Sequence, residues 1–171
     1  LTKVDVATKT VTYESGTITA DVLNIIPPQK AGKIAFTAGL TDEKGWCPVN
    51  HATFESTLKK NVHVIGDAAI AAPLPKSAYA ANSEAKVCAA AVYSLLNDKP
   101  LVEPSWINTC YSVIAPNDGI SVANVYALKD GKIISVENSG GVSAKYDPEM
   151  SKREVMYAHS WFKNITADIF G

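Results

Sequence analysis

Long apolar runs and blocks of one charge are missing from this sequence. No stretch of its 171 residues approaches the ~20 apolar residues that a membrane-spanning helix needs, so we predict no membrane span. Lysine and arginine total 16 against 17 acidic residues, and no basic block suggests a nucleic-acid partner. With 47% hydrophobic and 19% charged residues, the composition is typical of a folded globular chain.

Histidine and cysteine are also scarce, with three of each. His51 and His63 have no further histidine or cysteine at metal-ligand spacing, so we predict no metal site. Cys88 lies among alanines of a predicted helix and is interpreted as a small buried hydrophobic residue. Cys47 follows a tryptophan in a predicted loop, where a structural role is favoured. An odd cysteine count leaves the redox compartment open.

The most informative segment runs from 61 to 91. Val62, Val64 and Ile65 predict a short buried strand that Gly66 and Asp67 end abruptly. Glycine allows a ligand to approach the backbone closely, and an aspartate beyond the end of a strand can accept hydrogen bonds from ribose or ribityl hydroxyls. A tight turn capped by the aspartate has the same sequence pattern.

Other elements follow from hydrophobic periodicity and turn residues. We predict helices over 34–38, 77–96 and 149–164, the last with Val155, Met156, Ala158 and Phe162 on its apolar side. Strands are predicted within 3–13, from Ile18 after a turn at 14–17, and over 21–26, 109–114, 120–129 and 132–137, with a hairpin turn at 130–131.

Residues 58–68 and 74–82 resemble the second FAD-binding motif of the two-dinucleotide-domain flavoprotein disulfide reductases. This resemblance implies FAD as cofactor. It implies that Asp67 accepts hydrogen bonds from the ribityl hydroxyls and that Gly66 allows the cofactor to approach the backbone. Lys76 and Ser77 would lie near the flavin. A helix that begins near Ser77 would direct its positive end toward the electron-rich side of the ring.

The resemblance becomes narrower when four motifs are taken together. Residues 45–50, 73–77, 108–112 and 160–171 are similar, in order and spacing, to the flavoprotein subunit of flavocytochrome c sulfide dehydrogenase. The family implies that Cys110 is the C-terminal half of a redox disulfide beside the flavin, and that Trp161 lies at the flavin on its sulfide side. The partner cysteine of that disulfide would belong to a preceding part of the polypeptide.

The pyrophosphate-binding Gly-x-Gly-x-x-Gly turn of this family is absent from the 171 residues. Because neither an initiator Met nor a signal peptide opens the sequence, we expect the C-terminal part of a longer flavoprotein. Its fold would combine α/β and α+β parts: the end of an NAD-like domain (1–30), part of an FAD-binding domain (31–99), and a C-terminal antiparallel sheet with a helix (100–171).

The family implies oxidation of sulfide to sulfur or polysulfide, with attack of hydrosulfide either on the Cys110 disulfide or on the flavin. The family also implies that the electrons pass to a c-type cytochrome subunit. The sequence has no Cys-x-x-Cys-His haem motif, so any haem would be on a partner. The family also implies a location in the periplasm, where a thiol pair can stay oxidised.

Two alternatives remain open at this point. Sulfide:quinone oxidoreductase and type II NADH dehydrogenase share the superfamily architecture, but they usually carry amphipathic C-terminal membrane elements, and the tail here contains Lys163, Asn164 and Asp168. The 171 residues alone are also consistent with an inactive scaffold or docking domain, since half of the cofactor site is missing from them.

Overall fold

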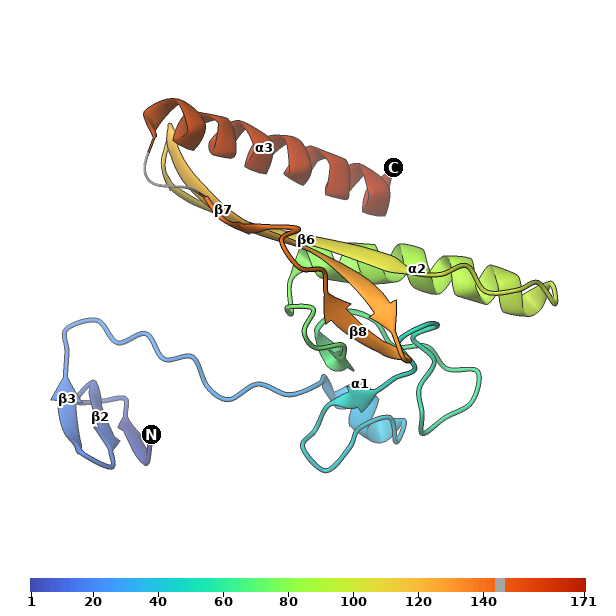
Figure 1. The fold of residues 1–171 in the computed structure, drawn as a ribbon. Coiled ribbons are helices and arrows are strands. Elements are labelled where there is room, and N and C mark those ends of the chain that lie inside the picture. Colours follow the sequence, from blue (N-terminus) through green and yellow to red (C-terminus); the bar gives the residue numbers. More distant parts are fainter. Residues whose placement is uncertain (144–146) are drawn as a thin grey trace.

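The N-terminal residues form a small antiparallel sheet that lies apart from the remaining elements. The computed structural model describes residues 1–143 and 147–171 (Figure 1), and this sheet contains β1 (Lys3–Asp5), β2 (Thr10–Tyr13) and β3 (Gly16–Thr19). The predicted turn at 14–17 is shorter than expected, because Gly16 already pairs with Tyr13. The predicted strand over 21–26 is wrong: this segment is extended but has no strand partner, and Val22 and Ile26 are exposed.

The segment from 33 to 70 contains little regular structure. It holds α1 (Lys33–Thr37), as predicted, a parallel pair of two-residue strands, β4 (Cys47–Pro48) and β5 (Ala69–Ile70), and the 3-10 turn η1 (Gly66–Ala68). The predicted strand over 62–65 is wrong. Its amide and carbonyl groups pair with a neighbouring loop, Val64 N–H with the Phe54 carbonyl and the Val62 carbonyl with Ser56 N–H, so no sheet forms there.

The predicted long helix is confirmed as α2 (Ala78–Leu96). Its alanines favour helix, and Ser77 caps its first turn by accepting a hydrogen bond from Ala80 N–H (3.1 Å). The helix lies along β6 (Ser105–Ala115), which begins after the short connection that follows Asn97.

The C-terminal region is an antiparallel sheet covered by a helix, as predicted. β6, β7 (Asp118–Lys129) and β8 (Lys132–Ser135) are adjacent, while β9 (Gly141–Val142) pairs with β7. The helix α3 (Pro148–Phe170) packs on β7 and β6 and is longer than the sequence indicates. Asp147 caps it by accepting hydrogen bonds from the N–H groups of Glu149 and Met150.

The apolar side predicted for α3 is partly wrong. Val155 is buried, but Met156 and Phe162 are 61% and 62% exposed. The buried face instead includes Ser151. Its hydroxyl accepts a hydrogen bond from Gly119 N–H (2.9 Å), so a polar contact joins the start of α3 to β7. Within the described ranges, no helix is both long and apolar enough to cross a bilayer.

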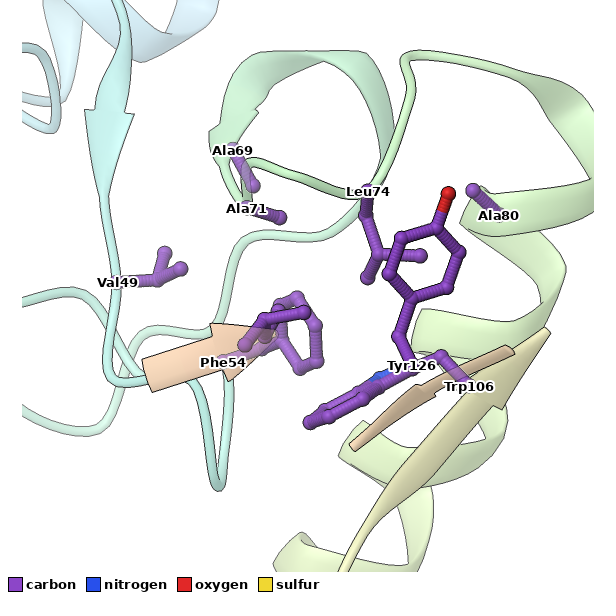
Figure 2. Packing of buried hydrophobic residues seen from close by; sticks show 9 residues of the cluster. Val49, Phe54, Ala69, Ala71, Leu74, Ala80, Trp106 and Tyr126 are labelled. Carbon is purple, nitrogen blue, oxygen red and sulfur yellow. The ribbon is translucent and has the colours of Figure 1, made fainter. Parts of the chain in front are cut away.

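One hydrophobic core joins the middle segment to the C-terminal sheet (Figure 2). Its buried members are Val49, Phe54, Ala69, Ala71, Leu74, Ala80, Trp106, Tyr126 and Ile133. Phe54 meets Trp106 edge to face, with ring centroids 6.2 Å apart. The core therefore spans both sides of the predicted boundary between 99 and 100, and the three-part domain division stays a prediction.

Gly140 lies in the connection between β8 and β9, where the backbone passes close to β7. The contacted part of β7 also pairs with β6. A Cβ at this position would overlap the backbone carbonyl of Ala123 and approach Asn124 Cα to 2.8 Å. We expect Gly140→Ala to lower the free energy of unfolding by about 1 to 3 kcal/mol, because backbone must shift to admit the methyl group. Gly32→Ala is the control, since its Cβ would meet nothing within 4 Å.

Urea unfolding of the two variants and the wild type measures the difference. Equal midpoints and slopes for Gly140→Ala and the wild type would contradict the close approach of the 136–141 connection to β7.

Candidate functional site

Five of the six predicted site residues line two cavities. Gly66 and Lys76 line a cavity of about 290 Å³ beneath the start of α2, and Ser77, Cys110 and Trp161 line a second cavity of about 430 Å³ between α2, β6 and α3. Asp67 belongs to neither lining, and its side chain is exposed on η1. The structure thus brings three of the six predicted residues together and leaves the roles of all six as predictions.

The first cavity is organised by the ammonium group of Lys76. Its Nζ donates hydrogen bonds to the backbone carbonyls of Asp67 and Ala69, the latter at 3.0 Å, and lies 3.9 Å from the ring centroid of Trp46. Gly66 begins η1 with a φ of +71°, a conformation that glycine adopts without strain. Lys76 therefore holds the turn that presents the Asp67 carboxylate.

Glu84 is a residue of this cavity that sequence reasoning missed. Its side chain is 2% exposed, and its Oε2 accepts a hydrogen bond from Gly66 N–H (2.5 Å). Burial raises the pKa of this carboxyl to about 7, although the Gly66 hydrogen bond and the charge of Lys76 act in the opposite direction. The only sequence signal was an acidic residue on an otherwise alanine-rich helix.

The second cavity is bounded by aromatic rings. Trp161 of α3 stacks on Tyr79 of α2, with centroids 5.4 Å apart and planes 10° from parallel, and it approaches Tyr111 of β6 at 6.2 Å. Ala78 and Tyr79 also line the cavity. The first N–H groups of a helix have no intrahelical partner, so the positive end of α2 opens on this space.

Cys110 lies on the wall of the same cavity, half-buried on β6. Its Sγ receives a hydrogen bond from Nδ2 of Asn108 (3.4 Å), and Asn108 Oδ1 accepts one from the Ser77 hydroxyl (2.6 Å). Asn108, which is 3% exposed, was quoted in a motif but assigned no role by the sequence. The helix cap and the thiol are thereby joined through one buried amide.

The other cysteines lie in packed surroundings. Cys47 is fully buried in a cluster with Ala31 and Ala35, which agrees with a structural role. Cys88 packs against the main core but is only partly buried, less than predicted. All three cysteines, including Cys110, are free thiols in the 171-residue chain.

Both histidines considered as metal ligands make structural hydrogen bonds. His63 Nδ1 donates to the Thr53 carbonyl (2.9 Å), as expected for a structural histidine. His51 Nδ1 accepts from Ile133 N–H (3.1 Å), so its Nε2 carries the proton and donates to the Ile70 carbonyl (3.0 Å). In the part of the chain that the structure describes, no group of His, Cys, Asp and Glu has the arrangement of a metal site.

Comparison with known protein families matches the C-terminal part of the chain. Residues 102–170 match the family model described as "Flavocytochrome c sulphide dehydrogenase, flavin-binding". The matched region contains β6, β7, β8, β9 and α3, and with them Cys110 and Trp161. This supports the predicted relationship and agrees with the prediction of FAD as the cofactor.

The described residues fit one end of a flavin. The exposed Asp67 carboxylate is an acceptor for sugar-alcohol hydroxyls, and a Cβ at Gly66 would meet only Ala81 Cβ, at 3.5 Å, so this edge is open. The cavity at the positive end of α2 is lined by Trp161 and Tyr79, whose rings suit a planar heterocycle. Groups for the pyrophosphate are not supplied by a glycine-rich motif of these residues.

The raised pKa of Glu84 makes stability depend on pH. In the unfolded chain this carboxyl has the ordinary pKa of 4.5, whereas in the folded chain its pKa is about 7. The folded state binds more protons between these values, so the free energy of unfolding should fall as pH rises through this window, by about 2 to 3 kcal/mol. Glu84→Gln keeps an acceptor for Gly66 N–H without a titrating group and should remove this contribution.

Urea unfolding of the wild type and Glu84→Gln at pH 5 and pH 8 checks the expectation. The variant should gain stability relative to the wild type at pH 8, and a difference that does not change with pH would contradict it.

Proposed function

We propose that this chain, whose residues 102–170 belong to the flavin-binding family of flavocytochrome c sulphide dehydrogenase, is the C-terminal part of an FAD-dependent sulfide dehydrogenase. The parent protein would oxidise sulfide to sulfur or polysulfide. Residues 1–30 and 31–99 would complete NAD-like and FAD-binding domains with a preceding part of the polypeptide. The 171 residues alone are expected to be inactive.

The observation that carries the proposal is the meeting of three separate segments at one cavity. Cys110 from β6, Trp161 from α3 and the capping Ser77 of α2 line the same space. Two of these residues lie within the family match, and the third lies in the segment that resembles an FAD-binding motif. A redox-active sulfur, an aromatic wall and a positive helix end are the parts that two-electron oxidation of a sulfur anion requires.

In the proposed reaction, Cys110 forms a disulfide with a cysteine of the preceding part. Hydrosulfide attacks one sulfur of this bond: a new S–S bond forms, the disulfide breaks, and a persulfide and a thiolate result. A flavin, when bound, would be the two-electron oxidant for this pair, so that the disulfide is restored and the sulfur leaves at the oxidation level of elemental sulfur or polysulfide. The rings of Trp161, Tyr79 and Tyr111 would shield the sulfur chemistry from water, and Asp67 would accept hydrogen bonds from the cofactor's hydroxyls.

The electron acceptor in this proposal is a c-type cytochrome, in a periplasmic complex. The family description names a flavocytochrome c, and the sequence carries no Cys-x-x-Cys-His of its own, so the haem would belong to a partner subunit. A disulfide that is used in every catalytic cycle suits the oxidising environment of the periplasm.

A quinone acceptor is the second candidate, and the outer face of α3 is what favours it. Met156, Phe162, Ile169 and Phe170 are exposed on this helix, and apolar side chains on the outside of a C-terminal helix are typical of membrane-surface attachment. Against it, Asp168 forms a salt bridge with Lys86 of α2 (2.8 Å), which holds the end of α3 on the protein.

Replacement of Cys110 tests the proposed chemistry directly. In the full-length parent, Cys110→Ser should lower sulfide-dependent cytochrome reduction by orders of magnitude, because no disulfide can form. Cys88→Ser is the matched control, since it should cost only about 1 to 2 kcal/mol of packing stability and leave turnover intact. Similar losses of activity in both variants, at equal flavin content and equal folded fraction, would contradict the role of Cys110.

The choice of acceptor separates the two candidate functions. We expect the parent to purify with a c-type cytochrome, to reduce its haem when sulfide is added, and to turn over slowly with a short-chain quinone. The measurement is haem and quinone absorbance in parallel assays with and without detergent. Rapid quinone reduction with no haem subunit in the purified complex would favour the quinone candidate instead.

A further inference from the structure

We propose that Asn108 is a positioning residue that sets the reactivity of the Cys110 sulfur and couples it to the cap of α2. Its importance for sulfide oxidation rests on the proposed function, but the contact itself does not. The side chain lies between two functional elements, and all of its polar contacts are to the residues of those elements.

The first step of the argument is strand geometry. Trp106, Asn108 and Cys110 alternate along β6, so their side chains leave the same face of the strand. Trp106 is locked in the core, Asn108 lies next to it, and Cys110 reaches the cavity. The amide therefore has core on one side and the thiol on the other, which restricts its motion.

The second step is the direction of the hydrogen bonds. The Ser77 hydroxyl donates to Asn108 Oδ1 at 2.6 Å, and Asn108 Nδ2 donates to Cys110 Sγ at 3.4 Å, whereas the contact from the Cys110 thiol to Asn108 Oδ1 is longer, at 3.8 Å. An N–H donor interacts more strongly with a charged sulfur than with a neutral thiol. The thiolate is the form that attacks disulfides and that a broken disulfide leaves behind.

The third step links the thiol to the helix. Ser77 Oγ also accepts the hydrogen bond from Ala80 N–H that caps α2. A group that binds at the start of α2 and displaces the Ser77 hydroxyl would thus change the position of the Asn108 amide, and with it the hydrogen bond to the Cys110 sulfur. The network offers a physical route by which occupancy of the cavity changes the reactivity of Cys110.

Alkylation of the reduced 171-residue chain tests the proposal without flavin or sulfide. Iodoacetamide modification of Cys110, followed by peptide mass spectrometry over a range of pH, reports the thiolate available at this position. We expect Asn108→Leu and Asn108→Asp to slow the modification of Cys110 roughly tenfold at pH 7.5, the factor that corresponds to one lost hydrogen bond to a charged group. The rate should fall most in the Asp variant, where a carboxylate replaces the N–H donor.

Two further variants separate positioning from stability. Ser83→Ala is the matched control: Ser83 Oγ accepts a hydrogen bond from Ile107 N–H (3.2 Å), so it also joins α2 to β6 but does not touch Cys110, and it should leave the rate unchanged across the pH range. Ser77→Gly retains most of the capping preference while it removes the donor to Asn108, and it should slow modification by a smaller factor.

The proposal is overturned if both Asn108 variants alkylate Cys110 within twofold of the wild-type rate, or if Ser83→Ala lowers the rate as far. If Asn108→Leu does not fold, the alkylation rate of Asn108→Asp alone decides the test, because Asp has nearly the same shape as Asn. Failure of the proposed function would leave this result standing, since a chain without flavin turnover can still show the altered thiol.

Discussion

The packing of Trp106 against Phe54 is the constraint on which the rest of the structure depends. The segment between 41 and 76 has only two-residue strands, isolated β-bridges and a 3-10 turn, so no long strand or helix of its own fixes its position. Its shape is set instead by side chains that enter the core beside Trp106, among them Phe54 and Leu74. Hydrogen bonds of His51 to Ile70 and Ile133 add a polar link between the same two regions. Without this core, the turn that carries Gly66 and Asp67 would have no defined position relative to the C-terminal sheet.

The same strand face that closes the core also builds the candidate site. Two residues beyond Trp106, Asn108 meets the cap of α2, and two residues further Cys110 borders the cavity. Because side chains of a strand repeat every second residue, packing at one position fixes the direction of the next two. Trp161 completes the arrangement from α3 by stacking on Tyr79. The cavity is therefore lined by residues of β6, α2 and α3 and by the cap of α2.

Two ionisable side chains near this site, Lys76 and Glu84, bond to backbone groups. Lys76 bonds two carbonyls of the 67–69 turn, while Glu84 accepts from the amide of the glycine that starts it. The buried Glu84 carboxyl lowers stability when it is ionised. We infer that this loss is offset by the hydrogen bond that holds the turn at Gly66. Both groups lie on or just before α2, and this makes the helix the element that positions the proposed cofactor-binding edge and, through Ser77, the sulfur.

The sequence by itself predicted the long elements and the family relationship. Alanine content predicted α2, hydrophobic pattern and an Asp-Gly turn predicted the strands of the C-terminal sheet, and four spaced motifs predicted the relationship that the match at 102–170 supports. Only the tertiary structure decided where short apolar segments go: 21–26 and 62–65 have strand-like residues but no strand to pair with. It also decided that Met156 and Phe162 face outward, and that Asn108 and Glu84 contact the site, because burial and hydrogen bonding between distant residues are properties of the assembled fold and leave no periodic pattern in the chain.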